Sequence, residues 1–198
     1  MKDLYRLTDL SKPHNFHEAF GDSNPIILDI GAGRGEFAAA MAQSNPRENY
    51  LCIEIRKHRV QSILKKKQTL GLSNIIVLQA RIEHLIPHCF FRHSIQKIYL
   101  NFPDPWPKNH QRNRRVFKPS FLNDLQEILA RHGELHFATD VTAYAKETHL
   151  ILSEHPGFEN ALEGRGWDNE AHPPVKTLFY QHALRAGATP VFLHFRKT

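Results

Sequence analysis

The chain has 198 residues, of which 41% are hydrophobic and 23% are charged, and its formal net charge at pH 7 is +6. These values suit one domain with one core, and no apolar stretch is long enough to cross a bilayer. Two cysteines exclude a disulfide scaffold and indicate a reducing compartment, by default the cytoplasm, while the basic balance favours an anionic partner.

Short apolar runs alternate with segments of helical periodicity along the chain. Strands are predicted at residues 26–30, 50–55, 74–79, 95–102, 134–139 and 190–195. Helices are predicted at residues 36–43, 60–70, 119–129 and 141–155, the third of them ended by Gly133, and the tail from residue 174 to the last strand reads as loop. This alternation predicts an α/β fold with a doubly wound, mostly parallel sheet in a single domain.

Acidic residues follow four of the predicted strands. In doubly wound sheets, ligands bind beyond the carboxyl ends of the strands. The candidates at these ends are Asp29, Glu54, Asp104 and Asp140.

The first candidate opens a glycine-rich turn, Asp29-Ile-Gly31-Ala-Gly33-Arg-Gly35-Glu36. Glycines there let the backbone approach a ligand closely, and the following helix offers free N–H groups. The spacing departs from the G-x-G-x-x-G pattern of dinucleotide sites. It resembles the (D/E)-x-G-x-G-x-G motif of class I methyltransferases, whose donor S-adenosylmethionine carries positive groups that suit Asp29. Taken alone, the motif is also compatible with a purely structural turn.

Glu54 ends the second predicted strand, 19 residues after Gly35. An acid at this place can accept hydrogen bonds from both hydroxyls of a ribose. The alternative is a solvated carboxylate that pairs with Arg56 or Lys57.

The most specific motif is the loop after the fourth strand, NFPDPWPKNHQRNRR, at residues 101–115. Three prolines stiffen this loop and restrict where Asp104 and Trp106 point. Trp106 has two interpretations, stacking on a base and packing of the loop onto the sheet. Positive charge beside such a loop can hold a phosphate backbone. The basic cluster consists of Lys108, Arg112, Arg114 and Arg115.

The sequence FPDPWPK followed by a basic run resembles the signature of bacterial tRNA (guanine-N7)-methyltransferases. The resemblance covers most of the chain, from the glycine turn to residues 138–140. It implies the class I methyltransferase fold in one domain of residues 1–198, S-adenosylmethionine as donor, and methylation of N7 of a variable-loop guanine in tRNA. Within that domain, residues 1–24 would be an N-terminal extension, 101–118 the catalytic and tRNA-binding loop, and 174–198 a C-terminal loop and strand.

The resemblance also implies roles for individual residues. Asp104 would be catalytic and would contact the donor. The other donor-binding residues would be Asp29, Gly31, Gly33 and Glu54. The residues expected to contact tRNA are Lys108, Asp140, Thr177, Arg112, Arg114 and Arg115.

Two positions depart from the family pattern. The family has an acid near the adenine after the third strand, and Ala80 and Arg81 stand there instead. The family also has a T-x-x-E motif near the C-terminus, in which this chain keeps Thr177 and places Tyr180 where the acid belongs. Anchoring of the adenine and recognition of the guanine depend on these positions.

Two other functions remain open at this stage. An amino-group methyltransferase would use a D-P-P-(Y/F/W) loop, which Asp104-Pro-Trp106 matches except for the second proline. The other is a non-catalytic RNA-binding protein on a methyltransferase scaffold, which the absence of the C-terminal acid at Tyr180 favours.

The remaining expectations concern metal and partners. His84, His88, Cys89 and His93 could be pictured as helical ligands, but no second pair has zinc-site spacing. We therefore expect no metal, no membrane, tRNA as partner, and a monomer or homodimer.

Overall fold

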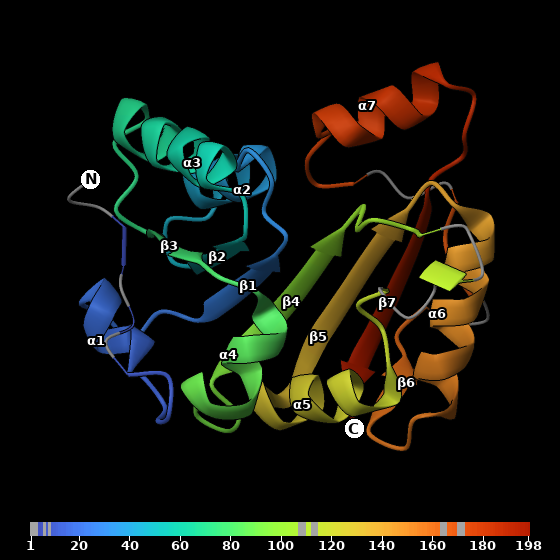
Figure 1. Ribbon diagram of the computed structural model, residues 1–198, viewed down its shortest axis with the longest axis horizontal. Coiled ribbons are helices and arrows are strands. Elements are labelled where there is room, and N and C mark those ends of the chain that lie inside the picture. Colours follow the sequence, from blue (N-terminus) through green and yellow to red (C-terminus); the bar gives the residue numbers. More distant parts are fainter. Residues whose placement is uncertain are drawn as a thin grey trace.

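The computed structural model describes residues 4, 5, 7, 9–106, 110, 111, 115–162, 166–169 and 173–198. Within these residues the chain forms one sheet of seven strands in the order β3-β2-β1-β4-β5-β7-β6 (Figure 1). The strands are β1 Ile26–Ile30, β2 Asn49–Glu54, β3 Ile75–Gln79, β4 Ile95–Asn101, β5 Leu129–Thr139, β6 Phe158–Asn160 and β7 Val191–Lys197. β1 to β5 pair in parallel, whereas β7 runs antiparallel between β5 and β6. The prediction of a doubly wound, mostly parallel α/β sheet is confirmed.

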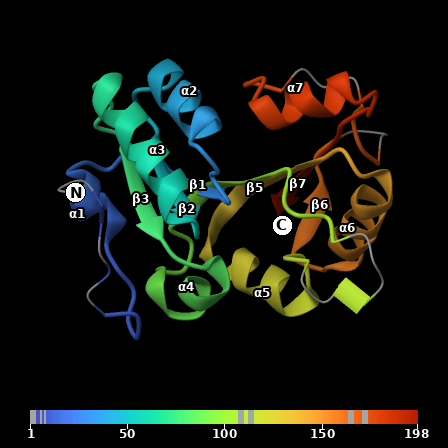
Figure 2. The same ribbon diagram turned by 45° about the horizontal axis from the view of Figure 1, so that its top comes forward.

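Helices lie on both sides of this sheet (Figures 1 and 2). They are α1 Phe16–Phe20, α2 Glu36–Ser44, α3 Lys57–Thr69, α4 Ile82–Cys89, α5 Pro119–Ile128, α6 Thr142–Glu154 and α7 Leu178–Arg185. One hydrophobic core joins α4, α5 and α6 to one face, and a second joins α2 and α3 to the other. Successive β1 residues serve different cores, Ile27 the second and Leu28 the first, because side chains alternate across a strand. No described helix has the length and apolar character that a bilayer crossing needs.

The structure corrects the end of one predicted helix. Gly133 does not end it: α5 ends at Ile128, and β5 begins at once with the fully buried Leu129. Leu129 pairs with Ile95, and the register with β4 then shifts before Glu134. Burial of Leu129 against the neighbouring strand outweighs the helix-ending signal of the glycine, which sits in the irregular part of the strand.

The tail was also predicted wrongly as loop, because residues 178–185 form α7. Thr177 caps this helix by accepting a hydrogen bond from the Tyr180 N–H at 3.2 Å, which is the usual role of a threonine at this position. The sequence reading also missed the helices α1 and α4 and the three-residue strand β6.

Candidate active site

The glycine-rich turn joins β1 to α2 at the carboxyl edge of the sheet. Gly31, Gly33 and Gly35 have φ values of 75°, 59° and 75°, in the left-handed region that glycine adopts at little cost. A side chain at Gly35 would also meet Ile63 at 2.8 Å, whereas no atom of the described residues lies within 4 Å of a Cβ built at Gly31. The turn therefore needs its glycines, and it leaves space beside Gly31.

Glu54 binds this turn from the end of β2. Its Oε2 accepts a hydrogen bond from the Gly33 N–H at 3.0 Å, and its Oε1 accepts from the N–H groups of Ile55 and Arg56 at 2.8 Å. The guanidinium of Arg59 lies 3.6 Å from the same carboxylate. Glu54 is buried and is not the solvated strand-end acid of the alternative interpretation, since it ties the turn to the start of α3.

Asp29 is the second buried acid at this edge, with 2% of its surface exposed. Its Oδ2 has no hydrogen-bond partner among the described residues. Burial, and then the charge of Glu54, raise the pKa of Asp29 to about 7. A buried carboxylate with an unused oxygen favours a positively charged ligand group beside it.

The loop after β4 is held in an unusual backbone conformation. Phe102 and Trp106 have φ values of 51° and 41°, and non-glycine residues in the left-handed region are uncommon and concentrate at functional sites. The Phe102 N–H donates to the Ala138 carbonyl of β5 at 2.8 Å. Asp104 stands between these two residues in the chain, and its side chain is exposed. Asp140, which directly follows the neighbouring strand β5, is exposed as well.

Arg115 lies inside the protein, with 4% of its surface exposed. Its Nε donates to the carbonyl oxygen of Pro105 at 2.7 Å and its Nη2 to that of Trp106 at 3.5 Å. Its Nη1 forms an ion pair with Glu147 on α6, and its guanidinium lies 4.6 Å from the ring centre of Tyr144. The sequence predicts a tRNA contact for Arg115, but its guanidinium instead fixes the loop that carries Asp104.

Thr177 lies close to the glycine turn, although 142 residues separate the two helix starts. The N–H of Leu178 donates to Oε2 of Glu36 at 2.9 Å, so the start of α7 lies beside the start of α2. The other predicted tRNA-binding residues, Lys108, Arg112 and Arg114, lie outside the described residues.

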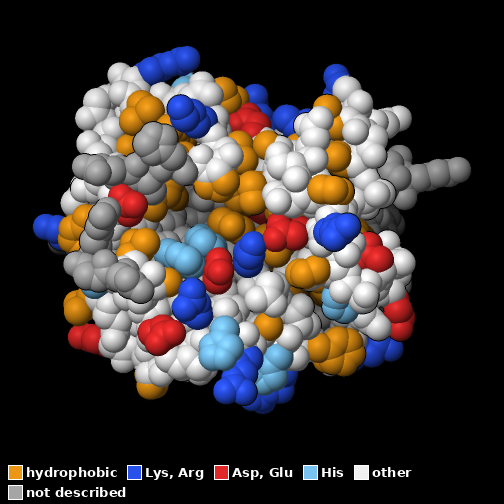
Figure 3. Space-filling view, turned by 180° about the vertical axis from the view of Figure 1, so that it is seen from behind, with side chains coloured by type: hydrophobic (Ala, Val, Ile, Leu, Met, Phe, Trp, Pro, Cys, Tyr) orange, Lys and Arg blue, Asp and Glu red, His pale blue; other side chains and the backbone are white. Residues whose placement is uncertain are grey.

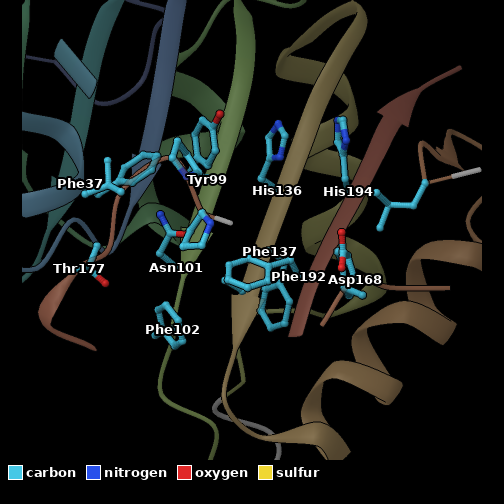
Figure 4. Close-up of a pocket in the computed structure, with 16 residues that line it drawn as sticks. Phe37, Tyr99, Asn101, Phe102, His136, Phe137, Asp168, Thr177, Phe192 and His194 are labelled. Carbon is cyan, nitrogen blue, oxygen red and sulfur yellow. The ribbon is translucent and has the colours of Figure 1, made fainter. Parts of the chain in front are cut away.

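A cavity of about 190 Å³ opens on the face of β4, β5 and β7, between Phe37 of α2 and the segment before α7 (Figure 4). Among its lining residues are Asn101, Phe102, His136, Thr177 and His194. The Nδ2 of Asn101 is buried and has no hydrogen-bond partner in the part of the chain that the structure describes. The sequence alone does not predict this cavity, because it is shaped by segments that are distant in sequence.

Comparisons with known proteins agree with this geometry. The profile of a family described as "Putative methyltransferase" matches residues 23–191. A tRNA (guanine-N(7)-)-methyltransferase of Syntrophotalea carbinolica is 32% identical over 97% of this chain and 82% of its own length. Another, from Listeria monocytogenes, is 37% identical over 74% of this chain and 70% of its own length.

Solved structures share the fold at low sequence identity. The 16S rRNA methyltransferase KamB superposes with a TM-score of 0.65 at 18% identity, over 92% of each chain. A SAM-dependent methyltransferase from Aquifex aeolicus superposes with a TM-score of 0.60 at 17% identity, over 92% of this chain and 88% of its own. The fold is therefore that of the class I methyltransferases.

Proposed function

We propose that this chain, which belongs to the family of the tRNA (guanine-N(7)-)-methyltransferases, transfers a methyl group from S-adenosylmethionine to N7 of a guanine in tRNA. The observation that carries the proposal is the strained 101–106 loop, which presents Asp104 at the carboxyl edge of a class I methyltransferase sheet. The target we propose within tRNA is a guanine of the variable loop.

The buried acids fit the donor. The Oδ2 of Asp29, which has no hydrogen-bond partner among the described residues, can pair with a positively charged group of the donor. The space beside Gly31 leaves room for that group. Oε1 of Glu54 already accepts two hydrogen bonds, whereas Oε2 accepts one. Oε2 therefore keeps one acceptor position, with which the carboxylate can bind a ribose hydroxyl while it holds the turn. S-adenosylmethionine supplies a methyl group on a positively charged sulfur. The protein's part is to bind the donor and to exclude water from it.

The acceptor atom needs little chemical help. N7 of guanine has an exposed lone pair and carries no proton, so the attack needs no general base. Rate enhancement then comes mainly from alignment of the reacting atoms. Because the methylated guanine is cationic, a carboxylate at Asp104 stabilises the charge that develops in the transition state. Asp140, exposed after the adjacent strand, takes the role of a substrate contact.

Positive charge brings the tRNA to this edge. Lys108 stands two residues after Trp106 in the sequence and can donate to O6 of guanine, the acceptor next to N7. Arg112 and Arg114 supply phosphate contacts. Arg115 is removed from this set, because its guanidinium is bonded within the protein.

The test is to incubate the pure protein with unmodified tRNA and donor labelled in its methyl group, and then to map the labelled nucleotide. Label in 7-methylguanosine of the variable loop supports the proposal in full. Label on an exocyclic amino group would replace it with the amino-group methyltransferase. Binding of tRNA without transfer, by a protein that also fails to bind the donor, would replace it with the non-catalytic RNA-binding protein.

A further inference from the structure

Three potential metal ligands gather on β5 and β7, on the face of the sheet that bears the cavity. Glu134 and His136 lie two residues apart on β5, so their side chains point to the same face. His194 of antiparallel β7 is the direct register partner of His136. Side chains at directly opposite positions have Cβ atoms only about 5 Å apart. The topology therefore places one carboxylate and two imidazoles on one small patch.

The contacts of the patch show that the three ligand atoms converge. Oε2 of Glu134 lies 2.8 Å from Nε2 of His136 and 3.4 Å from Nε2 of His194. All three ligand atoms lie within 4.8 Å of one another, and no other group of three His, Cys, Asp or Glu residues among the described residues meets this condition. Nε2 of His194 is buried, and apart from its 3.4 Å contact with the Glu134 carboxylate it makes no hydrogen bond among the described residues. Within that part of the chain, this nitrogen is thus engaged only by the carboxylate of the patch.

We propose that Glu134, His136 and His194 form a binding site for Zn²⁺. Two imidazole nitrogens and one carboxylate are a ligand set that zinc takes in proteins, with bonds of about 2.0–2.2 Å. Three protein ligands leave the fourth tetrahedral position open. His136 and His194 line the cavity on this face, so the open position is accessible to water or a small ligand from there.

The two imidazoles lie against each other on neighbouring strands. Their rings stack with centres 4.2 Å apart and planes at 18°, and the other face of His136 stacks on Tyr99. Figure 4 shows both rings pointing the same way from neighbouring strands, and Figure 3 shows histidines beside acidic and basic side chains near a hollow on this side of the molecule. Because a metal lies in the plane of each imidazole that binds it, the stacked rings would tilt about their side-chain torsions to direct both nitrogens onto one ion.

Glu134 faces a lysine on the neighbouring strand. Lys97 of β4 is its register partner, and the ammonium group of Lys97 pairs with Glu48 at 2.9 Å. This lysine therefore has an acidic partner other than Glu134.

The experiment uses protein treated with a chelator and then dialysed. We expect titration with Co²⁺ to give the intense visible absorption of a tetrahedral cobalt site at one equivalent, and Zn²⁺ to displace it. Zn²⁺ should also raise the melting temperature, since it binds the folded state. Two variants, His194→Ala and Glu134→Gln, should each weaken Zn²⁺ binding by more than the roughly 10- to 100-fold that loss of an outer partner causes.

The matched control is His84→Ala, which removes an exposed histidine of α4 from the group that the sequence spacing suggested. It should bind Zn²⁺ as the unchanged protein does. Absence of the cobalt absorption, or Zn²⁺ affinity that survives in both His194→Ala and Glu134→Gln, would overturn the site. Circular dichroism of each variant separates loss of the ligand from loss of the fold. None of these measurements depends on methyl transfer.

Discussion

The side chain of Arg115 donates a hydrogen bond to the carbonyl oxygen of Pro105 at 2.7 Å. Pro105 is the residue after Asp104, which we propose to be catalytic. The same guanidinium bonds the carbonyl of Trp106 and pairs with Glu147. A planar donor group with several N–H directions suits this set of partners, and the single ammonium of lysine does not. The loop conformation therefore depends on an arginine that the sequence alone assigned to tRNA.

The first prediction concerns this arginine. Arg115→Lys keeps the charge but cannot satisfy both carbonyls and Glu147, so Asp104 should lose its position. We expect kcat to fall about 10- to 100-fold, as misplacement by about 1 Å does, with little change in KM for tRNA. Steady-state kinetics against the exposed control Arg131→Ala checks this. Unchanged kcat with a raised KM would return Arg115 to the tRNA interface.

The second prediction concerns the charge of Asp104. Asp104→Asn keeps the shape of an exposed side chain but removes the carboxylate that opposes the developing positive charge. The single-turnover rate should fall about 100-fold, while tRNA affinity changes little. Glu159→Gln, which neutralises an exposed acid on β6, should leave the rate unchanged. A near-normal rate for Asp104→Asn would show that the charge is dispensable.

The third prediction separates two roles of Glu54, which holds the glycine turn and is proposed to bind ribose. Glu54→Gln should weaken binding of S-adenosylhomocysteine by roughly 1.5–3 kcal/mol, the range for hydrogen bonds to charged groups. Calorimetry with the 2′-deoxy form of this ligand provides the control. Removing the hydroxyl should weaken binding to the unchanged protein and have little further effect on the variant. If removal of the hydroxyl weakens binding equally in the unchanged protein and in the variant, Glu54 keeps its structural role alone.

The fourth prediction follows from Asp29, whose pKa of about 7 lies above its ordinary value of 3.8 because of burial and the charge of Glu54. Between about pH 4 and 7 the folded protein keeps a proton that the unfolded chain has released. Its free energy of unfolding therefore falls as pH rises through this window. Relative to the unchanged protein, Asp29→Asn should gain roughly 2–4 kcal/mol above pH 7 and nothing below pH 4. Urea unfolding at pH 4, 5.5 and 7.5 measures this, and a pH-independent difference would contradict the titration of Asp29.

The fifth prediction concerns the basic residues after the loop. If Arg114 neutralises one phosphate, Arg114→Ala should make the slope of log K against log[salt] for tRNA shallower by about 0.7 to 0.9. Donor binding should not change. The control in filter-binding titrations is Arg131→Ala, which changes an exposed residue near the start of β5, away from the carboxyl ends of the strands. Equal slopes for the unchanged protein and both variants would remove Arg114 from the interface.

Local sequence determined the central parallel sheet and the glycine turn. Buried strands such as residues 26–30 are continuous apolar runs. The glycines at positions 31, 33 and 35 indicate a turn with left-handed backbone. Both signals are carried by neighbouring residues, so they can be read without the fold. The same reading gave Asp29, Glu54 and Asp104 their places at strand ends. Their proposed roles in donor binding and chemistry remain to be tested.

Tertiary structure decided what depends on partners distant in the chain. Gly133 reads locally as a helix end, but pairing of Leu129 with Ile95 starts the strand earlier. Arg115 belongs by spacing to a basic run, yet Glu147 and the loop carbonyls draw it into the interior. Glu134, His136 and His194 have no zinc-site spacing, because 58 residues separate the two histidines and only the register of β5 with β7 brings them together. Sequence spacing reports ligands on one helix or turn, whereas ligands on paired strands are set by a register that long-range packing determines.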